Sequence, residues 1–216
     1  MDLNFKEIFA IINGYKNIVI VGHTNPDADA IGACFALASV VGGMGKNVCV
    51  LLENLPERYS FMLRSNFALN ADVSTLSDYL FIALDCGDMG RFKPFTNVFA
   101  KAAATMNIDH HVTGVPFADH NYVWAAASST CEIIYNLLTA NGVTIDKNIA
   151  TALYAGIVAD TGSFRHQYTS PQTLVTAANL MKTGIEFSKI TTTLLHTRTK
   201  SETHLLARAF FRPSKQ

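Results

Sequence analysis

The stretch from Asn17 to Ala33, NIVIVGHTNPDADAIGA, constrains the fold more than any other part of the chain. It begins with a run of four β-branched residues, which predicts a buried β-strand. It ends in small and apolar residues that predict the start of a helix. The turn between them carries a polar side chain at every second position, namely His23, Asn25, Asp27 and Asp29.

This polar turn predicts a binding site for a divalent metal ion. In an extended segment, side chains with a period of two lie on one side, so one imidazole, one amide and two carboxylates would face a single point. Two close carboxylates repel each other unless a cation or a proton lies between them, and Asp and His together suit hard to borderline metal ions. The alternative is structural: Asn25-Pro26-Asp27 is only a turn, and Asp29 caps the helix.

Strand and helix patterns alternate along the rest of the chain. The patterns predict strands at 18–21, 48–52, 79–84, 105–108 and 122–125, and helices at 4–13, 31–41 and 58–67, from 129, from 146 and over 171–184. Ser129 and Glu132 have the spacing of a capping box at the start of one of these helices. The alternation predicts an α/β fold: a doubly wound, mostly parallel sheet flanked by helices.

Acidic and histidine residues follow several of the predicted strands. Asp85 follows the third strand, Asp109-His110-His111 follows the fourth, and Asp160 follows a later helix. In doubly wound sheets, ligands bind beyond the carboxyl ends of the strands. These clusters, together with the turn after the first strand, therefore point to one common site.

Composition excludes several classes of function. The chain has 17 basic and 17 acidic residues and no basic stripe, which argues against a broad footprint on duplex DNA but allows a small phosphorylated ligand. Its four cysteines have neither zinc-site nor disulfide spacing and are expected to be buried free thiols in a reducing cytosol. We also find no signal-peptide pattern and no apolar run of membrane-spanning length, so we expect a cytoplasmic protein without a membrane partner.

Four segments in order, GHTNPDADAIGA, ALDCGDMGR, NIDHH and YAGIVADTGSFR, resemble the N-terminal motifs of the DHH phosphoesterase (RecJ-like) family. Two further segments, AASSTCEIIYNLL and DTGSFRHQYTSPQT, are similar to its branch of oligoribonucleases (nanoRNases) that also act on 3′-phosphoadenosine 5′-phosphate (pAp). The resemblance covers nearly the whole chain. A lone Asp-His-His would be weak evidence, whereas four motifs in order are specific.

The resemblance implies a centre of two divalent metal ions. His23 and Asp27 would bind one ion, Asp85 would bridge the two, and the other ion would be bound by Asp29, His110 and Asp160. The family generally uses Mn²⁺, and the oxygen and imidazole ligands are also compatible with Mg²⁺, Co²⁺ or iron.

The resemblance also implies roles for residues that do not bind metal. His111 would be catalytic through contact with the phosphate or the hydroxide-bearing centre, and Asp109 would orient a histidine by hydrogen bonding. Arg91 and Arg165 are candidate phosphate contacts or, equally, surface arginines, and Ser128 is a candidate substrate contact. The remaining histidines lack metal-ligand spacing, and we interpret them as structural or exposed: His120, His166, His196 and His204.

The function implied is hydrolysis of short oligoribonucleotides, in the manner of a 3′–5′ exonuclease, or of pAp by metal-activated water. The partner would be a small nucleotide or short single-stranded RNA, and a homo-oligomer is left open. Inorganic pyrophosphate, polyphosphate and cyclic dinucleotides are alternative substrates. An alternative of another class is a non-catalytic nucleotide-binding regulatory module.

The domain prediction places a DHH catalytic domain at 1–190 and a helical connector at 191–216. Related proteins continue into a second, DHHA1-type lobe with a glycine-rich substrate motif, and no such motif is present in this sequence. We therefore expect these residues to support metal binding and its chemistry better than the selection of a substrate.

Overall fold

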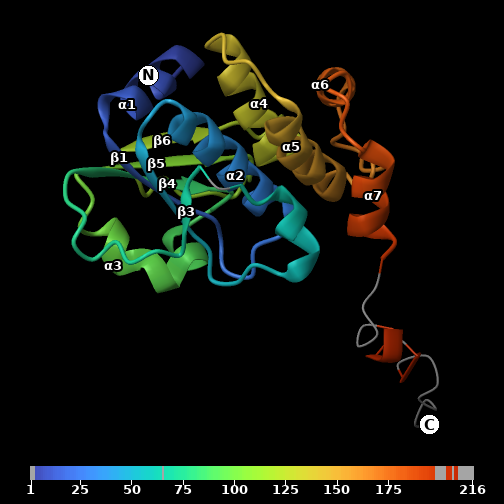
Figure 1. The fold of residues 1–216 in the computed structure, drawn as a ribbon, viewed down its shortest axis with the longest axis horizontal. Coiled ribbons are helices and arrows are strands. Elements are labelled where there is room, and N and C mark those ends of the chain that lie inside the picture. The colour runs from blue at the N-terminus through green and yellow to red at the C-terminus, as the bar shows by residue number, and fades with distance from the viewer. Residues whose placement is uncertain (1–2, 65, 198–202, 206, 209–216) are drawn as a thin grey trace.

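The computed structural model describes residues 3–64, 66–197, 203–205 and 207–208 (Figure 1). Its centre is a six-stranded sheet in the order β3-β2-β1-β4-β5-β6, in which every pairing is parallel. The strands are β1 (Asn17–Val21), β2 (Asn47–Leu51), β3 (Ala68–Leu69), β4 (Tyr79–Leu84), β5 (Ala104–Asp109) and β6 (His120–Val123). This order confirms the predicted doubly wound α/β sheet, because the chain turns back at β1 and then adds strands on the other side.

Helices connect the strands and continue beyond the last one. The α-helices are α1 (Phe5–Gly14), α2 (Ala28–Gly43), α3 (Thr96–Phe99), α4 (Thr130–Ala140), α5 (Lys147–Asp160), α6 (Pro171–Met181) and α7 (Phe187–Leu195). Two 3₁₀-helices, η1 (Glu57–Met62) and η2 (Met89–Phe95), complete the connections. α3 lies on the opposite side of the sheet from α4 and α5 (Figure 1).

The two faces of the sheet contribute to two separate hydrophobic cores. In β1, Ile18 and Ile20 belong to the larger core beneath α1, α2 and α4, whereas Val19 and Val21 belong to the smaller core against η2 and α3. Alternate residues of a strand point to opposite faces, so a run of β-branched residues can fill both cores at once. This burial explains why β1 reads as a continuous apolar segment.

Two glycines allow α2 and α5 to pack closely in the larger core. A Cβ atom added at Gly32 would lie 2.5 Å from the backbone oxygen of Ala152, and one added at Gly156 would collide with Cys131 Sγ. The absence of side chains at these two positions lets the helices approach until their backbones are near contact. The approach brings the C-terminal half of α5 next to the start of α2.

Several helix starts agree with the caps predicted from sequence. Asp146 caps α5, and Ser170 with Pro171 begins α6. The capping box at α4 is only half formed: the Ser129 side chain accepts from the Glu132 backbone, but the Glu132 carboxylate accepts from Ser128 instead of Ser129. The carboxylate of Glu132 is directed inward because Thr173 of α6 also donates to it.

Other elements differ from the predictions. The helix expected at 58–67 is the 3₁₀-helix η1, the strand expected at 122–125 is β6 at His120–Val123, and α2 begins three residues before 31. The elements β3, η2 and α3 were not predicted, because they are short or, in η2, contain Pro94, and α7 overlaps the helical connector expected at 191–216 but begins before it. α7 runs across the domain boundary predicted at residue 190, and much of 191–216 lies outside the described residues. Among the described residues, no helix combines the length and the apolar character that a bilayer crossing requires.

Candidate metal centre

The candidate site lies at the carboxyl ends of the two central strands. β1 and β4 are neighbours in the sheet, and the chain leaves them toward opposite sides of the strand order. His23 follows β1 by two residues, Asp85 follows β4 directly, and Asp109 is the last residue of β5. Ligands of open α/β sheets bind at this switch point in the strand order, so the topology places these side chains where a ligand is expected.

Asp85 occupies the middle of the site. It is 2% exposed and has a φ angle of +61°, in the left-handed region that non-glycine residues rarely adopt. Its Oδ2 atom lies 3.5 Å from His23 Nε2, and its Oδ1 atom lies 3.6 Å from His110 Nε2. The two oxygens therefore face two histidines from different strand ends. The strained backbone conformation of Asp85 directs its side chain between these histidines.

The turn after β1 is not a uniform extended segment, which corrects the period-two argument. Asn25 has a φ angle of +51° and is exposed, and its backbone N–H donates to Glu53. Asp27 caps α2 by accepting the N–H groups of Asp29 and Ala30 on Oδ1, while its Oδ2 lies 3.7 Å from His23 Nε2. The helix cap is therefore Asp27 and not Asp29, and the capping residue also faces the site.

Asp29 is fully buried within the first turn of α2. Its two carboxylate oxygens accept the backbone N–H groups of Thr130 and Cys131 at 2.7 and 2.9 Å. These donors are the unpaired amides at the start of α4, where the helix dipole favours negative charge. The start of α4 thus compensates part of the cost of burying this carboxylate.

Asp160 and His110 complete the site from the ends of α5 and β5. Asp160 is the last residue of α5, and its Oδ2 atom lies 3.3 Å from His110 Nε2. Asp29, His110 and Asp160 offer ligand atoms within 4.8 Å of one another, and so do His23, Asp27 and Asp85. A third overlapping group contains Asp85, His110 and His111. The first two groups coincide with the two ligand sets that the resemblance implied, with Asp85 in contact with both.

Hydrogen bonds fix the orientation of two of the three histidines. His23 Nδ1 lies 2.8 Å from the carbonyl oxygen of Thr24, which places a proton on Nδ1 and turns Nε2 toward the site. His111 Nδ1 lies 2.7 Å from Asp109 Oδ1, which also accepts the backbone N–H of His110. Asp109 is fully buried, and it therefore positions the Asp-His-His segment without facing the ligand space itself.

The electrostatics of the site show an excess of negative charge. Burial and the nearby carboxylates of Asp85 and Asp27 raise the pKa of Asp160 to about 7. Burial, with Asp85 and Asp160, raises the pKa of Asp29 well above its usual value. Burial disfavours the imidazolium of His23, but the carboxylates of Asp27 and Asp85 outweigh it and raise its pKa to about 10. All three shifts mean that the cluster holds protons unusually strongly.

The remaining shifts have the same electrostatic origin. Partial burial opposes ionisation of Asp27, but hydrogen bonds from His23 and from backbone amides lower its pKa. The hydrogen bond to Asp109 raises the pKa of His111 despite partial burial. A cluster that retains protons in this way also attracts metal cations, and its donors are oxygen and imidazole nitrogen, which suit Mn²⁺, Mg²⁺ and Co²⁺. The residues present therefore fit a divalent metal centre.

The three candidate substrate contacts differ in placement. Arg91 is exposed, and its backbone oxygen accepts from Thr24 at 2.6 Å, which ties its loop to the turn after β1. Arg165 is exposed, and its Nε donates to the Gly162 backbone beside the end of α5. Ser128 is fully buried and donates to Glu132 at 2.6 Å, so this placement does not support a substrate contact.

Sequence reasoning missed two residues that position the site. Thr130 donates to both Asp85 and Asp29, and Gly156 leaves room for Asp29, because an added Cβ would lie 2.7 Å from its Oδ1 atom. A glycine inside the apolar helix YAGIVAD was the available signal for a close approach. The threonine gave no separate signal, because a residue at the first turn of a helix is explained by capping alone.

Comparisons with known proteins identify the family of this chain. The model of the DHH family, N-terminal domain, matches residues 17–157. A protein of Streptococcus mutans named "Probable bifunctional oligoribonuclease and PAP phosphatase NrnA" is 30% identical over 195 residues, which are 86% of this chain and 59% of that protein. A "Probable manganese-dependent inorganic pyrophosphatase" of Enterococcus faecalis is 26% identical over 157 residues, which are 69% of this chain and 50% of that protein.

A solved structure shares the fold. The exopolyphosphatase-related protein of Bacteroides fragilis has a TM-score of 0.84 at 23% sequence identity, over 96% of this chain and 64% of that one. This chain spans between half and three fifths of the two curated relatives described above. The family model covers well over half of the chain and includes the strand ends with His23, Asp85 and His110. The chain belongs to the DHH family and contains its N-terminal domain.

Proposed function

We propose that this chain forms the metal-binding domain of a two-metal phosphoesterase that hydrolyses short oligoribonucleotides and pAp. The observation that carries the proposal is the meeting of two ligand groups around Asp85 at the carboxyl ends of β1, β4 and β5. The name of the Streptococcus mutans relative supports this choice of substrate class. The proposed catalytic domain covers 1–190, and the four buried free cysteines support a cytoplasmic location.

Two divalent ions are assigned to the two groups. His23 and Asp27 would hold one ion, Asp29, His110 and Asp160 would hold the other, and Asp85 would bridge them. Manganese is our choice because the residues offer only oxygen and imidazole donors and because the Enterococcus faecalis relative is named as manganese-dependent. Bound ions of this kind supply Lewis acidity toward phosphoryl oxygens and lower the pKa of bound water.

The chain's own groups orient the phosphate. Asp109 holds the His111 ring by its Nδ1 atom, and 44% of the His111 side chain is exposed, so its other nitrogen is available to a ligand. The Arg91 loop is tied to the turn after β1, and Arg165 follows the end of α5, so their guanidinium groups are our candidates for binding phosphate oxygens. Binding energy from these contacts would align the scissile phosphate.

The direct test is hydrolysis by the purified chain with Mn²⁺ and, in parallel, with a chelator. The substrates are pAp, a 5′-labelled dinucleotide and an unrelated phosphomonoester, and Asp85→Asn is the inactive control. We expect Mn²⁺-dependent turnover of pAp and of the dinucleotide that the control lacks. Equal turnover with the chelator, or in Asp85→Asn, would contradict a metal-dependent reaction at this site.

Inorganic pyrophosphate is the second candidate substrate, because a relative named as a pyrophosphatase matches 69% of this chain. The same assay separates the two candidates when pyrophosphate is included as a substrate. Preference for pyrophosphate over both nucleotides would replace the first proposal. Tight Mn²⁺ binding without turnover of any substrate would instead favour the non-catalytic regulatory module.

A further inference from the structure

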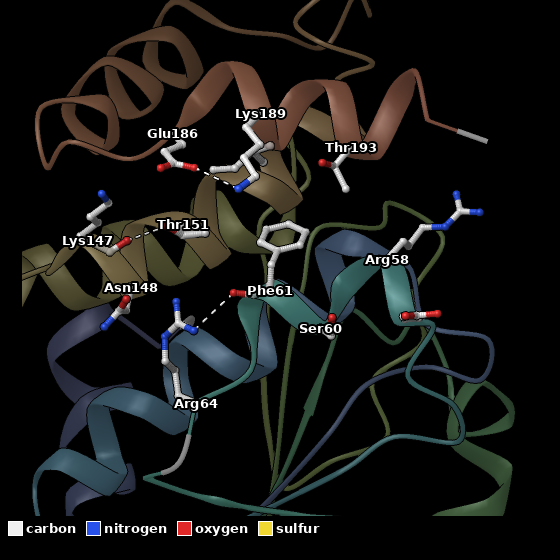
Figure 2. A pocket seen from close by; sticks show the side chains of 12 residues that line it. Arg58, Ser60, Phe61, Arg64, Lys147, Asn148, Thr151, Glu186, Lys189 and Thr193 are labelled. Atoms are coloured by element: carbon white, nitrogen blue, oxygen red, sulfur yellow. Dashed lines mark hydrogen bonds and ion pairs between the residues drawn. The ribbon is translucent and has the colours of Figure 1, made fainter. Parts of the chain in front are cut away.

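A cavity lies away from the metal centre. It has a volume of about 460 Å³, is open to solvent on one side, and is bordered by η1, the first turns of α5, and α7 (Figure 2). This volume is within the range of about 300–1,000 Å³ that is typical of small-molecule sites. Three separate elements contribute its walls, so the cavity depends on the tertiary packing of the chain.

The cavity and the metal centre are at opposite ends of α5. Lys147, Asn148 and Thr151 line the cavity, whereas Asp160 at the other end of the helix belongs to the metal centre. A helix of this length extends about 20 Å at roughly 1.5 Å per residue. A small ligand in the cavity would therefore not touch the metal ligands.

The lining of the cavity is enriched in positive charge. The chain as a whole has no net charge, but four basic and two acidic side chains line the cavity. These are Arg58, Arg64, Lys147, Lys189, Glu57 and Glu186. Glu186 pairs with Lys189 at 3.4 Å, but both side chains are largely exposed, so this pair is weak and can rearrange. The surplus of cations indicates an anionic ligand.

Arg64 is held with an unused donor. Its Nη1 atom donates to the backbone oxygens of Phe61 and Leu63 at 3.3 and 2.6 Å. Its Nε atom is buried and has no hydrogen-bond acceptor among the described residues. A buried N–H group without an acceptor is costly, so the Arg64 side chain gains from any shift that brings this N–H to an anionic oxygen in the cavity. Figure 2 shows Arg64 and Lys189 on two sides of the space next to Phe61.

Phe61 supplies an apolar surface in the same space. Its ring projects from η1 toward α7 and lies near the middle of the cavity (Figure 2). An aromatic ring offers a stacking surface to a planar base, and arginine and lysine beside it offer donors to a phosphate. An apolar platform next to a cationic edge matches a ligand that carries both groups.

We propose that this cavity is a second, metal-independent binding site for a nucleoside 5′-monophosphate. The base lies against Phe61, and the phosphate lies between Arg64 and Lys189. The same chemistry is present in a free mononucleotide and in the 5′-phosphorylated end of a short RNA. The inference goes beyond the proposed function and does not depend on it, because no residue of the metal centre contacts this ligand.

The test is isothermal titration of the metal-free chain in chelator with adenosine 5′-monophosphate, adenosine and a 5′-phosphorylated dinucleotide. The variants are Arg64→Gln, Lys189→Gln and Phe61→Leu, and Lys101→Gln is the matched control because it removes one exposed charge beyond α3. We expect adenosine to bind at least about tenfold more weakly than the monophosphate, and Arg64→Gln and Lys189→Gln each to raise its Kd about tenfold. Phe61→Leu should weaken both the monophosphate and adenosine, and Lys101→Gln should change neither.

Circular dichroism establishes whether Arg64→Gln is folded, and Lys189→Gln, at an exposed position, decides the matter if it is not. The proposal is overturned if the wild-type chain binds no monophosphate, if adenosine binds equally well, or if the cavity variants bind like Lys101→Gln. If the monophosphate binds at the cavity, a dinucleotide that binds more than tenfold tighter identifies an RNA end as the ligand. Otherwise the ligand is the free nucleotide. Chelator excludes the metal centre from these titrations, so loss of the proposed hydrolysis leaves their outcome unaffected.

Discussion

Thr130 Oγ1 donates a hydrogen bond to Asp85 Oδ1 across 3.0 Å, although the two residues are 45 positions apart. The backbone N–H of Thr130 donates to Asp29 Oδ2 across 2.7 Å. Thr130 is fully buried. One residue at the start of α4 therefore orients one carboxylate from each of the two ligand groups.

We predict that Thr130→Val weakens metal binding without unfolding the chain. Valine keeps the shape but lacks the hydroxyl, so Asp85 loses the donor that orients it while Asp29 keeps its backbone donor. Loss of such an outer hydrogen bond typically lowers metal affinity by about 10–100-fold. Titration with Mn²⁺ measures the affinity. Thr130→Ser keeps the hydroxyl and should retain most of the wild-type affinity. Thr139→Val, on the exposed side of α4, is the control. An unchanged Mn²⁺ affinity would remove Thr130 from the site.

Asp85→Asn should abolish binding of both ions and hydrolysis while preserving the fold. The amide has the size of the carboxylate but lacks its charge, and asparagine tolerates the positive φ angle of this position, so strain does not confuse the result. Elemental analysis of the purified variant gives metal content, and circular dichroism gives the fold. A variant with two bound ions and near-normal turnover would show that Asp85 is not the bridge.

His110→Ala and His111→Ala should have different effects. His110 Nε2 faces Asp85 and Asp160, so its loss should reduce metal content to about one ion per chain. His111 is held by Asp109 and is more exposed, so its loss should leave the metal content unchanged and lower kcat. Metal content and kcat are measured for both variants. The assignment is reversed if His111→Ala loses metal and His110→Ala does not.

Gly156→Ala should destabilise the chain and disturb Asp29. The new methyl group would collide with Cys131 Sγ and crowd Asp29 Oδ1, and overpacking of this kind costs about 1–3 kcal/mol. Gly43→Ala is the matched control, because a Cβ at that position at the end of α2 meets nothing within 4 Å. Thermal unfolding of both variants is the measurement. Similar Tm values would mean that the contact between α2 and α5 is not as close as described.

The metal-free chain should lose stability as the pH rises from 5 to 8.5. The folded-state pKa of Asp160 is raised to about 7, so the folded chain retains a proton that the unfolded chain releases near pH 4. The pKa of His23 is raised to about 10, so its stabilising contribution is complete below about 6.5 and declines above that pH. Both shifts have the same sign, and Tm should fall across this range.

Bound Mn²⁺ should flatten this pH dependence, because the cation replaces the protons that balance the carboxylates. The measurement is Tm against pH with Mn²⁺ and with chelator. A metal-free Tm that rises from pH 5 to 8.5 would mean that the cluster does not retain protons in the folded state.

Local sequence determined most of the fold. The β-branched run of β1 and the apolar run of β4 favoured buried strands, and their alternation with capped helices predicted a parallel doubly wound sheet. The residues at the strand ends could also be assigned to one site, since that topology gathers the carboxyl ends of parallel strands at one edge. Specific ligand roles came from the resemblance of four ordered segments to a family, and not from spacing alone.

Tertiary structure decided how those residues meet. Asn25 points out of the site because its left-handed backbone breaks the period of two, a conformation that the sequence pattern did not show. Thr130, Gly156 and the cavity beside Phe61 depend on contacts between elements that are distant in the chain. Periodicity reports which face of an element is buried, whereas the partner across that face depends on how helices pack. The sequence therefore determined the sheet and the set of candidate ligands. Only the packing of α4 and α5 against α2 decided which neighbouring residues orient those ligands.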